Sequence, residues 1–432
     1  MSRRRPEAPL TSLPCPTPKI MRHILSLTVL VLSGIAAFPP GSDAAPSSGV
    51  GQFGLTIDLG PEQVVAPGAG WPYLFQSTTG TTAVLGHVRW VPGQGNPIVF
   101  FNRSFDGRKS WEPWTPSAAH GAGPITEGVV VELPDGRIYV YDVYAYHVGG
   151  ETFSGRRWLS RDGLRSLEPA EAVELRVPQI ATSGQIDDRG EPVNRLYIRR
   201  SMLRLPSGDL LASAYGRFNW DTAKVEYLPS MNQSSSYLLR STDEGLSWKL
   251  LSVIATSPLG QEGAGEPVLV RVTQGPKAGR IICQMRVGRE HAIWQAESDD
   301  DGRTWTAAHP LRWTYSRFGR SRELVGVDPD LTEMADGTLV MSYGHKIDYQ
   351  DNGNFLAFSL DHGATWTAET RLSSSMTVAY TGVREVTPGE LFVVYTTTDA
   401  RDPADYRRTV DEGRFTTVGR AIKVRRAAPL TK

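Results

Sequence analysis

Six positions in the sequence combine chemically active side chains with a fixed spacing. Each lies nine residues before the glycine of a strand–turn–strand pattern, counted back from Gly80, Gly136, Gly208, Gly275, Gly337 and Gly389. The positions are Trp71, Glu127, Arg199, Glu266, Asp328 and Tyr380. All but the tryptophan can ionise, and ionisable groups are rarely buried without partners. We therefore expect these side chains to meet in one polar site, with a set of exposed strand ends as the alternative.

A second set of polar and aromatic residues stands where the strand after each turn would end. Its members are His87, Tyr144, Arg217, Arg286 and His345. Acids, arginines and aromatic faces together suit the binding of a sugar, and an arginine can hold a carboxylate through two parallel hydrogen bonds. We expect this set to line a substrate pocket together with Arg199 and Trp71.

Six segments with one common pattern would position these residues. Each contains an apolar strand, a turn with glycine and a second apolar strand, and they span residues 71–89, 127–144, 200–216, 266–286, 328–344 and 380–396. Radial repetition of four-stranded sheets gives a β-propeller, in which few strand edges are exposed. We predict an all-β fold, a six-bladed β-propeller of four-stranded antiparallel blades. Residues 52–59 and 421–426 would pair in the last blade and close the ring.

A shorter repeat follows most of these segments. Copies begin at Ser104, Ser160, Ser241, Ser298 and Ser359. In each, Asp stands two residues after the Ser, Gly three or four residues after it, Ser or Thr six residues after it, and Trp (once Leu) seven residues after it. Asp and Gly suit a tight turn. A calcium loop would need more oxygen ligands at alternate positions. We therefore expect the aspartates to hold turns.

These repeats and strands resemble the sialidase (neuraminidase) superfamily over most of residues 60–400. Segment 380–396 resembles the one that carries the tyrosine nucleophile, with Tyr380 in its place. Segment 266–286 resembles the one that carries the glutamate partner and an arginine that binds the substrate carboxylate, at Glu266 and Arg286. The resemblance implies that Glu266 removes the phenol proton so that Tyr380 can attack the anomeric carbon.

The sequence departs from the family pattern at two places. Trp71 stands where the first arginine of the carboxylate-binding triad is expected, and the loop expected to carry the acid, residues 91–100, contains no acidic residue. Asp328 and Glu127, from the same set of six positions, are our candidates for the acid.

The chain divides into a leader and a long remainder. We expect residues 1–44 to form an N-terminal extension and signal peptide, with Met21 as an alternative start, an apolar run after it, and small residues Ser42 and Ala44 before the expected cleavage point. Residues 45–432 would form the propeller, with no membrane span in the mature chain. The protein is thus expected to be exported, to the periplasm or the extracellular space.

Composition narrows the range of partners. Lysine and arginine number 46 and aspartate and glutamate 46, so the chain lacks the net charge that draws a protein to nucleic acid. No phosphate-binding glycine loop and no Cys/His spacing for zinc is present, so we expect no cofactor and no metal. Cys283 lies in an apolar strand and is expected to be a buried structural thiol.

Together these features predict an exported glycoside hydrolase that acts on a glycan or glycoconjugate. The specific expectation is an exo-α-sialidase that retains configuration through a Tyr/Glu pair. Two alternatives stay open: a propeller glycosidase or lyase for another sugar, uronic or deoxy, and a non-catalytic propeller that binds carbohydrate.

Overall fold

The structure is a computed structural model, and nearly all of the regular elements that it describes are β-strands. It describes residues 54–89, 98–113, 128–187, 190–288, 291–312, 323–345, 353–373, 375, 380–400, 405, 409, 412 and 414–426. All of these belong to one compact unit, Pro46–Lys432. Within this part of the chain, no helix has the length and apolar character needed to span a bilayer. The predicted all-β fold is confirmed.

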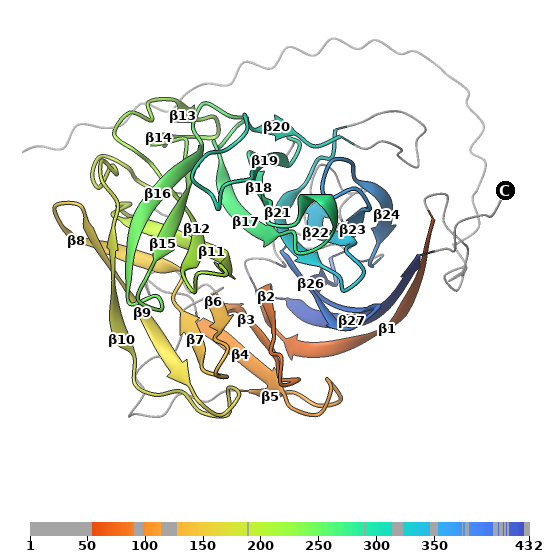
Figure 1. Cartoon of the computed structure of the whole chain (residues 1–432). Coiled ribbons are helices and arrows are strands. Elements are labelled where there is room, and N and C mark those ends of the chain that lie inside the picture. The colour runs from red at the N-terminus through yellow and green to blue at the C-terminus, as the bar shows by residue number, and fades with distance from the viewer. Residues whose placement is uncertain are drawn as a thin grey trace, which may run out of the picture. The chain divides into compact units, whose positions relative to one another are not determined.

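Four sheets each contain four antiparallel strands (Figure 1). One is made of β2 (Gly70–Gln76), β3 (Thr82–Arg89), β4 (Ile98–Ser104) and β5 (Glu112–Pro113). Another is made of β17 (Gly265–Arg271), β18 (Ile281–Arg286), β19 (Trp294–Ser298) and β20 (His309–Pro310), with the 3-10 helix η1 (Gly275–Lys277) between its first two strands. A third is made of β21 (Val327–Glu333), β22 (Leu339–His345), β23 (Gly353–Ser359) and β24 (Thr367–Arg371). The fourth joins both ends of the described chain, because β1 (Leu55–Pro67) pairs with β27 (Phe415–Arg426), beside β26 (Glu390–Thr398) and β25 (Thr381–Thr387).

A larger sheet of nine strands occupies the middle of the sequence. It contains β6 (Val129–Glu132), β7 (Ile138–Tyr141), β8 (Tyr144–Gly149), β9 (Thr152–Ser160), β10 (Glu171–Arg176), β11 (Arg195–Arg204), β12 (Leu210–Gly216), β15 (Ser235–Ser241) and β16 (Ser247–Ala255). Strand β8 pairs with both β9 and β11, and β10 pairs in parallel with β16. As a result, seven of these strands, β8–β9–β10–β16–β15–β12–β11, form a closed ring of pairings.

The nine-stranded sheet corrects one expectation from the sequence. Six separate four-stranded sheets were predicted, and four are found. In place of the other two, strand β8 and the β10–β16 pairing join the predicted strands into one sheet. A separate two-stranded hairpin, β13 (Lys224–Val225) and β14 (Leu228–Asn232), precedes β15.

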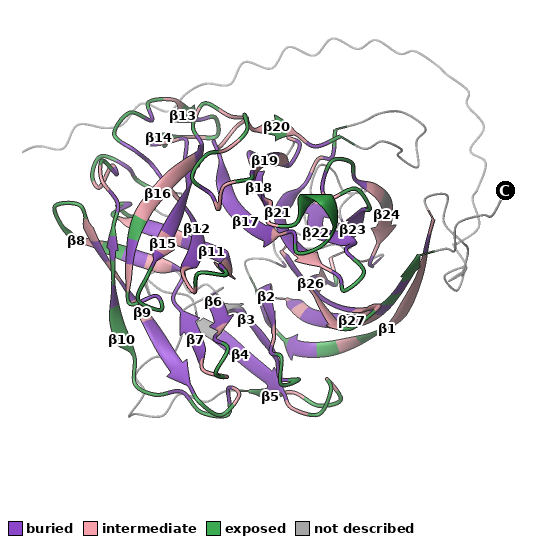
Figure 2. Cartoon of the chain, in the orientation of Figure 1, coloured by how far each residue is buried: buried purple, intermediate pink, exposed green. Residues whose placement is uncertain are grey.

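The pattern of buried and exposed residues differs between strands. Six of the seven residues of β17 are buried, whereas buried and exposed residues alternate in β10, as shown in Figure 2. A strand covered on both faces needs a nearly continuous apolar run, and a strand with one solvated face needs alternation. Cys283 lies in strand β18 and is buried, as predicted.

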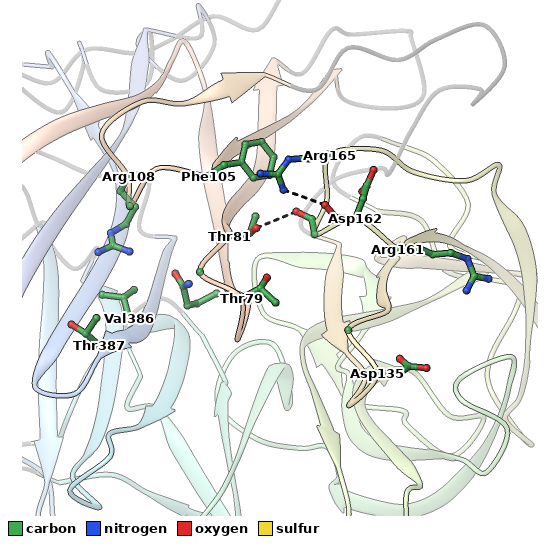
Figure 3. A pocket seen from close by; sticks show the side chains of 15 residues that line it. Thr79, Thr81, Phe105, Arg108, Asp135, Arg161, Asp162, Arg165, Val386 and Thr387 are labelled. Carbon is green, nitrogen blue, oxygen red and sulfur yellow. Dashed lines mark hydrogen bonds between the residues drawn. The ribbon is translucent and has the colours of Figure 1, made fainter.

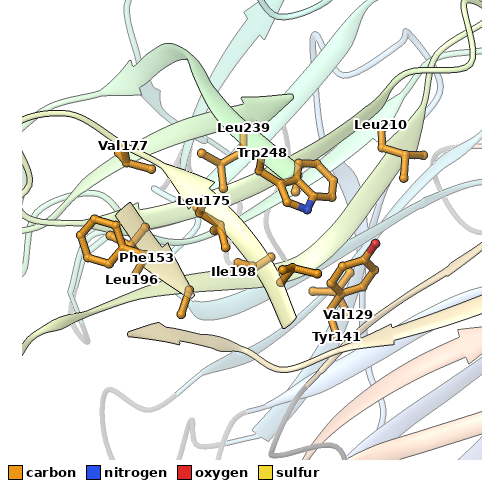
Figure 4. Close-up of a cluster of buried hydrophobic side chains, with 14 of the residues drawn as sticks. Val129, Tyr141, Phe153, Leu175, Val177, Leu196, Ile198, Leu210, Leu239 and Trp248 are labelled. Atoms are coloured by element: carbon orange, nitrogen blue, oxygen red, sulfur yellow. The ribbon is translucent and has the colours of Figure 1, made fainter. Parts of the chain in front are cut away.

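Buried apolar side chains form several clusters that join the strands. The cluster in Figure 4 unites β6, β7, β9 and β10 with β11, β12, β15 and β16, and includes Trp248, Tyr141 and Phe153. A second cluster joins β17 and β18 to β21, β22 and β23 through Ile282, Leu331 and other buried residues. Apolar packing thus occurs both between strands of the nine-stranded sheet and between two separate sheets.

The serine–aspartate repeats are turns, as predicted. In the copy at Ser298, the backbone N–H of Thr304 donates to Asp300 Oδ1 at 2.9 Å, the Thr304 hydroxyl donates to Oδ2 at 2.6 Å, and the Gly302 N–H donates to Ser298 Oγ at 2.9 Å. The hydroxyl and backbone hydrogen bonds from Thr304 lower the pKa of Asp300 to about 2. The aspartate is thus fully engaged in its own loop.

Candidate active site

The first strands of three sheets share one irregularity. In β2, β17 and β21, two residues oppose a single residue of the next strand, which is the definition of a β-bulge. These residue pairs are Trp71–Pro72, Glu266–Pro267 and Asp328–Pro329. Proline suits the second place because it has no N–H to donate to the sheet.

The first residue of each bulge has a left-handed backbone. The φ angles are 54° at Trp71, 47° at Glu266 and 51° at Asp328. This conformation costs a non-glycine residue about 1–3 kcal/mol, and such residues cluster at functional sites. The bulge re-aims the side chain, so all three residues leave the regular alternation of their strands.

Strand β11 carries a larger bulge. Ile198 pairs with Ala214 and Met202 with Ala212, so three residues, 199–201, oppose one. Arg200, with a φ of 38°, is the left-handed residue here. Both Arg199 and Arg200 are buried, and both enter the site.

The central contact joins Tyr380 to Glu266. The Tyr380 hydroxyl donates a hydrogen bond to Glu266 Oε1 at 2.6 Å. Arg286, the last residue of β18, donates through Nη1 to the two Glu266 oxygens at 3.2 and 3.3 Å, and through Nη2 to Glu262 Oε1 at 2.7 Å. The phenol, two carboxylates and a guanidinium group thus form one connected cluster.

Asp328 is a fully buried member of this cluster. Its Oδ1 accepts from Arg199 Nη2 at 2.7 Å, and its Oδ2 is 2.5 Å from Arg200 Nη2. Arg199 Nη2 is also 3.9 Å from Glu266 Oε1. The two guanidinium groups lie 5.7 and 5.3 Å from the centre of the Tyr380 ring. Arg199 therefore contacts the carboxyl groups of both Asp328 and Glu266 and lies close to the Tyr380 ring.

Burial and charge set the protonation of the cluster. Burial alone raises the pKa of Glu266, but the attraction of Arg286 and Arg199 and the hydrogen bond from Tyr380 outweigh it and lower the pKa to about 2. Burial raises the pKa of Asp328 to about 7, against the attraction of Arg200 and Arg199. Burial and the negative charge of Glu266 raise the pKa of Tyr380 well above 10. At neutral pH the phenol keeps its proton and Glu266 is ionised.

The other predicted residues take more distant places. The Trp71 ring lies 6.2 Å from that of Tyr380. Tyr144 meets Tyr197 edge-on at 5.4 Å, and Tyr197 stacks on Tyr215 at 4.6 Å.

Arg217, His345, His87 and Glu127 are not placed in the central cluster. Arg217 is buried and donates to the carbonyl of Asn232 at 2.7 Å. The His345 ring lies 6.0 Å from that of Phe355. His87 belongs to β3, but its side chain lies outside the described residues, as does the whole of Glu127.

Two residues of the cluster were not predicted. Arg200 is one residue beyond the nine-residue spacing, because the bulge in β11 contains one residue more than the others. Glu262 precedes β17 in a loop and has no equivalent in the other segments. The repeated dipeptides Trp-Pro, Glu-Pro and Asp-Pro were a signal of the bulges that the spacing alone did not use.

A separate hollow lies at the other ends of the strands (Figure 3). It has a volume of about 650 Å³, and its lining includes Thr79, Asp135, Arg165 and Thr387. Thr387 ends β25, whereas Tyr380 immediately precedes that strand, so the two lie roughly 20 Å apart along it at 3.3 Å per residue. The hollow is thus distinct from the Tyr380–Glu266 cluster.

A comparison of the sequence with models of protein families shows the family to which the chain belongs. Residues 93–345 match the family model described as the BNR repeat-like domain, which is more than half of the 432 residues. The chain belongs to the BNR repeat-like domain family. No curated protein matches this BNR repeat-like chain at the level of sequence.

Solved structures of other proteins share the fold of this BNR repeat-like chain. A protein of unknown function from Dyadobacter fermentans DSM 18053 has a TM-score of 0.60 at 18% identity, covering 85% of this chain and 99% of that one. A mutant of the NanB sialidase from Streptococcus pneumoniae has a TM-score of 0.55 at 12% identity, covering 84% and 70%. A mutant of the α-L-arabinofuranosidase Arb93A from Fusarium graminearum has a TM-score of 0.56 at 13% identity, covering 84% and 98%. The all-β, sialidase-like fold is thus established.

Proposed function

We propose that the chain is an exported glycoside hydrolase that uses Tyr380 as nucleophile and Glu266 as its base. The observation that carries this proposal is the 2.6 Å hydrogen bond from the partly buried phenol to a carboxylate. A nucleophile within hydrogen-bond reach of its base, with a third group orienting the base, is the general arrangement for covalent catalysis. Here Arg286 is the orienting group, because it contacts both oxygens of Glu266.

We also propose that the sheets are the blades of a six-bladed propeller. The two halves of the nine-stranded sheet, β6–β7–β9–β10 and β11–β12–β15–β16, have the strand sequence of the four-stranded sheets. First strands also contact one another in series, from β6 to β11, β17, β21, β25 and β2. A further apolar cluster, with Tyr73 and Val130, links the sheet of β2 to β6. This arrangement would put Tyr380 and Glu266 at one mouth of a central channel.

The proposed reaction proceeds in two steps. In the first, Tyr380 Oη bonds to the anomeric carbon as the bond to the leaving oxygen breaks; Glu266 accepts the phenol proton and an acid protonates the leaving group. In the second, a water molecule attacks the same carbon and gives a proton to that acid, while the Tyr380 oxygen departs and recovers its proton from Glu266. Two displacements retain the configuration of the sugar.

The acid is assigned by elimination between our two candidates. Asp328 has no exposed side-chain surface and is held between two guanidinium groups. That position suits the orientation of Arg199 and Arg200 better than proton transfer to a leaving group. We therefore propose Glu127, which lies outside the described residues, as the acid.

Two specificities compete within this proposal. The resemblance favours an exo-α-sialidase, and one of the proteins of similar fold is named as a sialidase. Another is named as an α-L-arabinofuranosidase, which supports a different sugar on the same framework. Screening the chain against aryl glycosides, the α-sialoside and α-L-arabinofuranoside included, tests the reaction class. Turnover of at least one substrate, abolished in Tyr380→Phe, supports the proposal; turnover that survives this change contradicts it.

A further inference from the structure

We propose that the sugar taken by this site carries no carboxylate, because an internal carboxylate, that of Asp328, already occupies the arginine pair that a substrate carboxylate would use. The proposal rests on the proposed glycosidase function and names its class of substrate, an uncharged sugar. It departs from the sialidase expectation at one point, the recognition of charge.

The first observation concerns Arg199 and Arg200. Each directs Nη2 at a different oxygen of Asp328, at 2.7 and 2.5 Å. The exposed fractions of the three side chains are 5%, 0% and 0%. Two guanidinium groups on the two oxygens of one carboxylate are what an arginine clamp would offer an acidic sugar. Here the ligand position is filled from within the chain.

The second observation concerns Arg286, the most exposed arginine of the cluster. Its Nη2 binds Glu262 at 2.7 Å and its Nη1 binds Glu266 at 3.2 Å. A substrate carboxylate at this guanidinium group would come to lie beside two carboxylates of the protein. Like charges in a partly buried site repel strongly, since water screens them poorly.

The third observation is the balance of charge. Among the described residues of the cluster, the guanidinium groups of Arg199, Arg200 and Arg286 face the carboxyl groups of Asp328, Glu262 and Glu266. Each guanidinium group thus has a carboxyl group of the protein beside it, and a substrate carboxylate would have to compete with these groups for the arginines. Buried charges are tolerated when they are paired in this way.

Aromatic side chains near the cluster are also accessible. Trp71 and Tyr380 are only partly buried, with their rings 6.2 Å apart. Tyr227, from the turn between β13 and β14, is 51% exposed and close enough to Arg286 to contribute to its raised pKa. Aromatic faces and a Tyr–Glu pair can bind the apolar face and the hydroxyl groups of a neutral sugar without a cation.

Paired substrates test the proposal on the wild-type protein. The 4-nitrophenyl glucoside and galactoside are compared with the matching glucuronide and galacturonide, together with the α-L-arabinofuranoside and the α-sialoside. We expect one or more neutral glycosides to be cleaved with kcat/KM at least 100-fold above every acidic one. Equal or faster cleavage of an acidic glycoside overturns the proposal while leaving the glycosidase assignment intact.

Failure of catalysis must be separated from failure of specificity. If no glycoside is cleaved, the glycosidase assignment fails, and binding of the free neutral and acidic sugars is followed by saturation-transfer NMR. Binding of neutral sugars alone still supports the charge argument. Binding of an acidic sugar, or of neither class, counts against it.

A variant that removes the charge of Asp328 tests whether this side chain keeps Arg199 and Arg200 from binding an anion. Asp328→Asn keeps the shape of the side chain and removes its charge, so it should raise the affinity for N-acetylneuraminate or acetate at least tenfold, in a salt-dependent way. Asp330→Asn is the matched control, because Asp330 is also fully buried and pairs with Arg384 at 2.7 Å. No gain in Asp328→Asn, or the same gain in both variants, contradicts the proposal. Should Asp328→Asn fail to fold, inhibition of the wild type by acetate at constant ionic strength would overturn it and lack of inhibition would support it.

Discussion

Arg199 contacts two carboxylates with one nitrogen: Nη2 lies 2.7 Å from Asp328 Oδ1 and 3.9 Å from Glu266 Oε1. Arg199 therefore connects the buried carboxyl group of Asp328 with Glu266, the carboxylate that would meet the substrate. Removing it leaves Asp328 with a single guanidinium partner in a region without water access.

We expect Arg199→Ala to destabilise the protein strongly. Removing one partner of a buried ion pair leaves an uncompensated charge and typically costs about 3–5 kcal/mol. Urea unfolding of the variant measures this loss. Arg176→Ala removes an exposed pair with Glu174 and should change the unfolding free energy by only about 0–1 kcal/mol. Similar losses in the two variants would contradict the assigned role of Arg199.

Tyr380→Phe deletes only the phenol oxygen and should reduce kcat by several orders of magnitude without unfolding the protein. Glu266→Gln keeps a hydrogen-bond acceptor but loses the base, so we expect a smaller loss, about 10²–10⁴-fold. A fluorinated glycoside of the correct sugar should label Tyr380, as peptide mass spectrometry can establish.

A second tyrosine–glutamate pair provides the control for this experiment. Tyr395 donates to Glu62 at 2.7 Å, in the sheet of β1 and β26. Tyr395→Phe should lower stability by about 1 kcal/mol and leave kcat unchanged. A fluorinated substrate that labels a carboxylate instead of Tyr380 would refute the tyrosine mechanism.

The pKa of Glu266 predicts how stability depends on pH. This pKa is lowered from 4.5 to about 2 in the folded protein. The folded state thus binds fewer protons than the unfolded state in this range, and the ionised carboxylate stabilises the fold fully above pH 4.5. That contribution is lost as the pH falls from 4.5 to 2.

The difference in unfolding free energy between wild type and Glu266→Gln isolates this effect. It should be constant above about pH 5 and should shift in favour of the variant as the pH falls towards 2. Urea titrations at pH 7, 4 and 3 measure it. A difference that does not change between pH 7 and 3 would show that the carboxylate is not held ionised.

Asp300→Ala and Asp361→Ala should each lower stability by about 1–3 kcal/mol, because backbone donors of the turn lose their acceptor. The activity of the folded fraction should stay at the wild-type level. Lys249→Ala, at an exposed position of β16, should change stability by less than about 0.5 kcal/mol. Normal stability combined with lost turnover in the aspartate variants would give the repeats a catalytic role.

Local patterns were enough to predict most strands and the turns. The glycine spacing selected Glu266 and Tyr380, and the structure places these two residues in contact although 114 positions separate them. The pairing of β1 with β27 also followed from two short apolar segments. These features depend on alternation and turn chemistry, which each segment carries within itself.

Other features depend on contacts that no single segment contains. The bulge in β11 holds one extra residue, so a fixed spacing selected Arg199 and passed over Arg200. Strand β8 pairs with two partners, β9 and β11, and only the second of these pairings joins the two halves of the sheet. Glu262 enters the site from an irregular loop, where side-chain direction follows neither a helical nor a strand period.

The pairing of β1 with β27 also constrains the order of folding. Strand β1 emerges first among the described strands, and its partner emerges last, so its backbone edge stays unpaired until synthesis has passed Arg426. An open edge can pair with strands of other chains. We therefore expect chains that end after β26 to self-associate through β1, and expect the full chain to gain protease resistance only once its final strand is available.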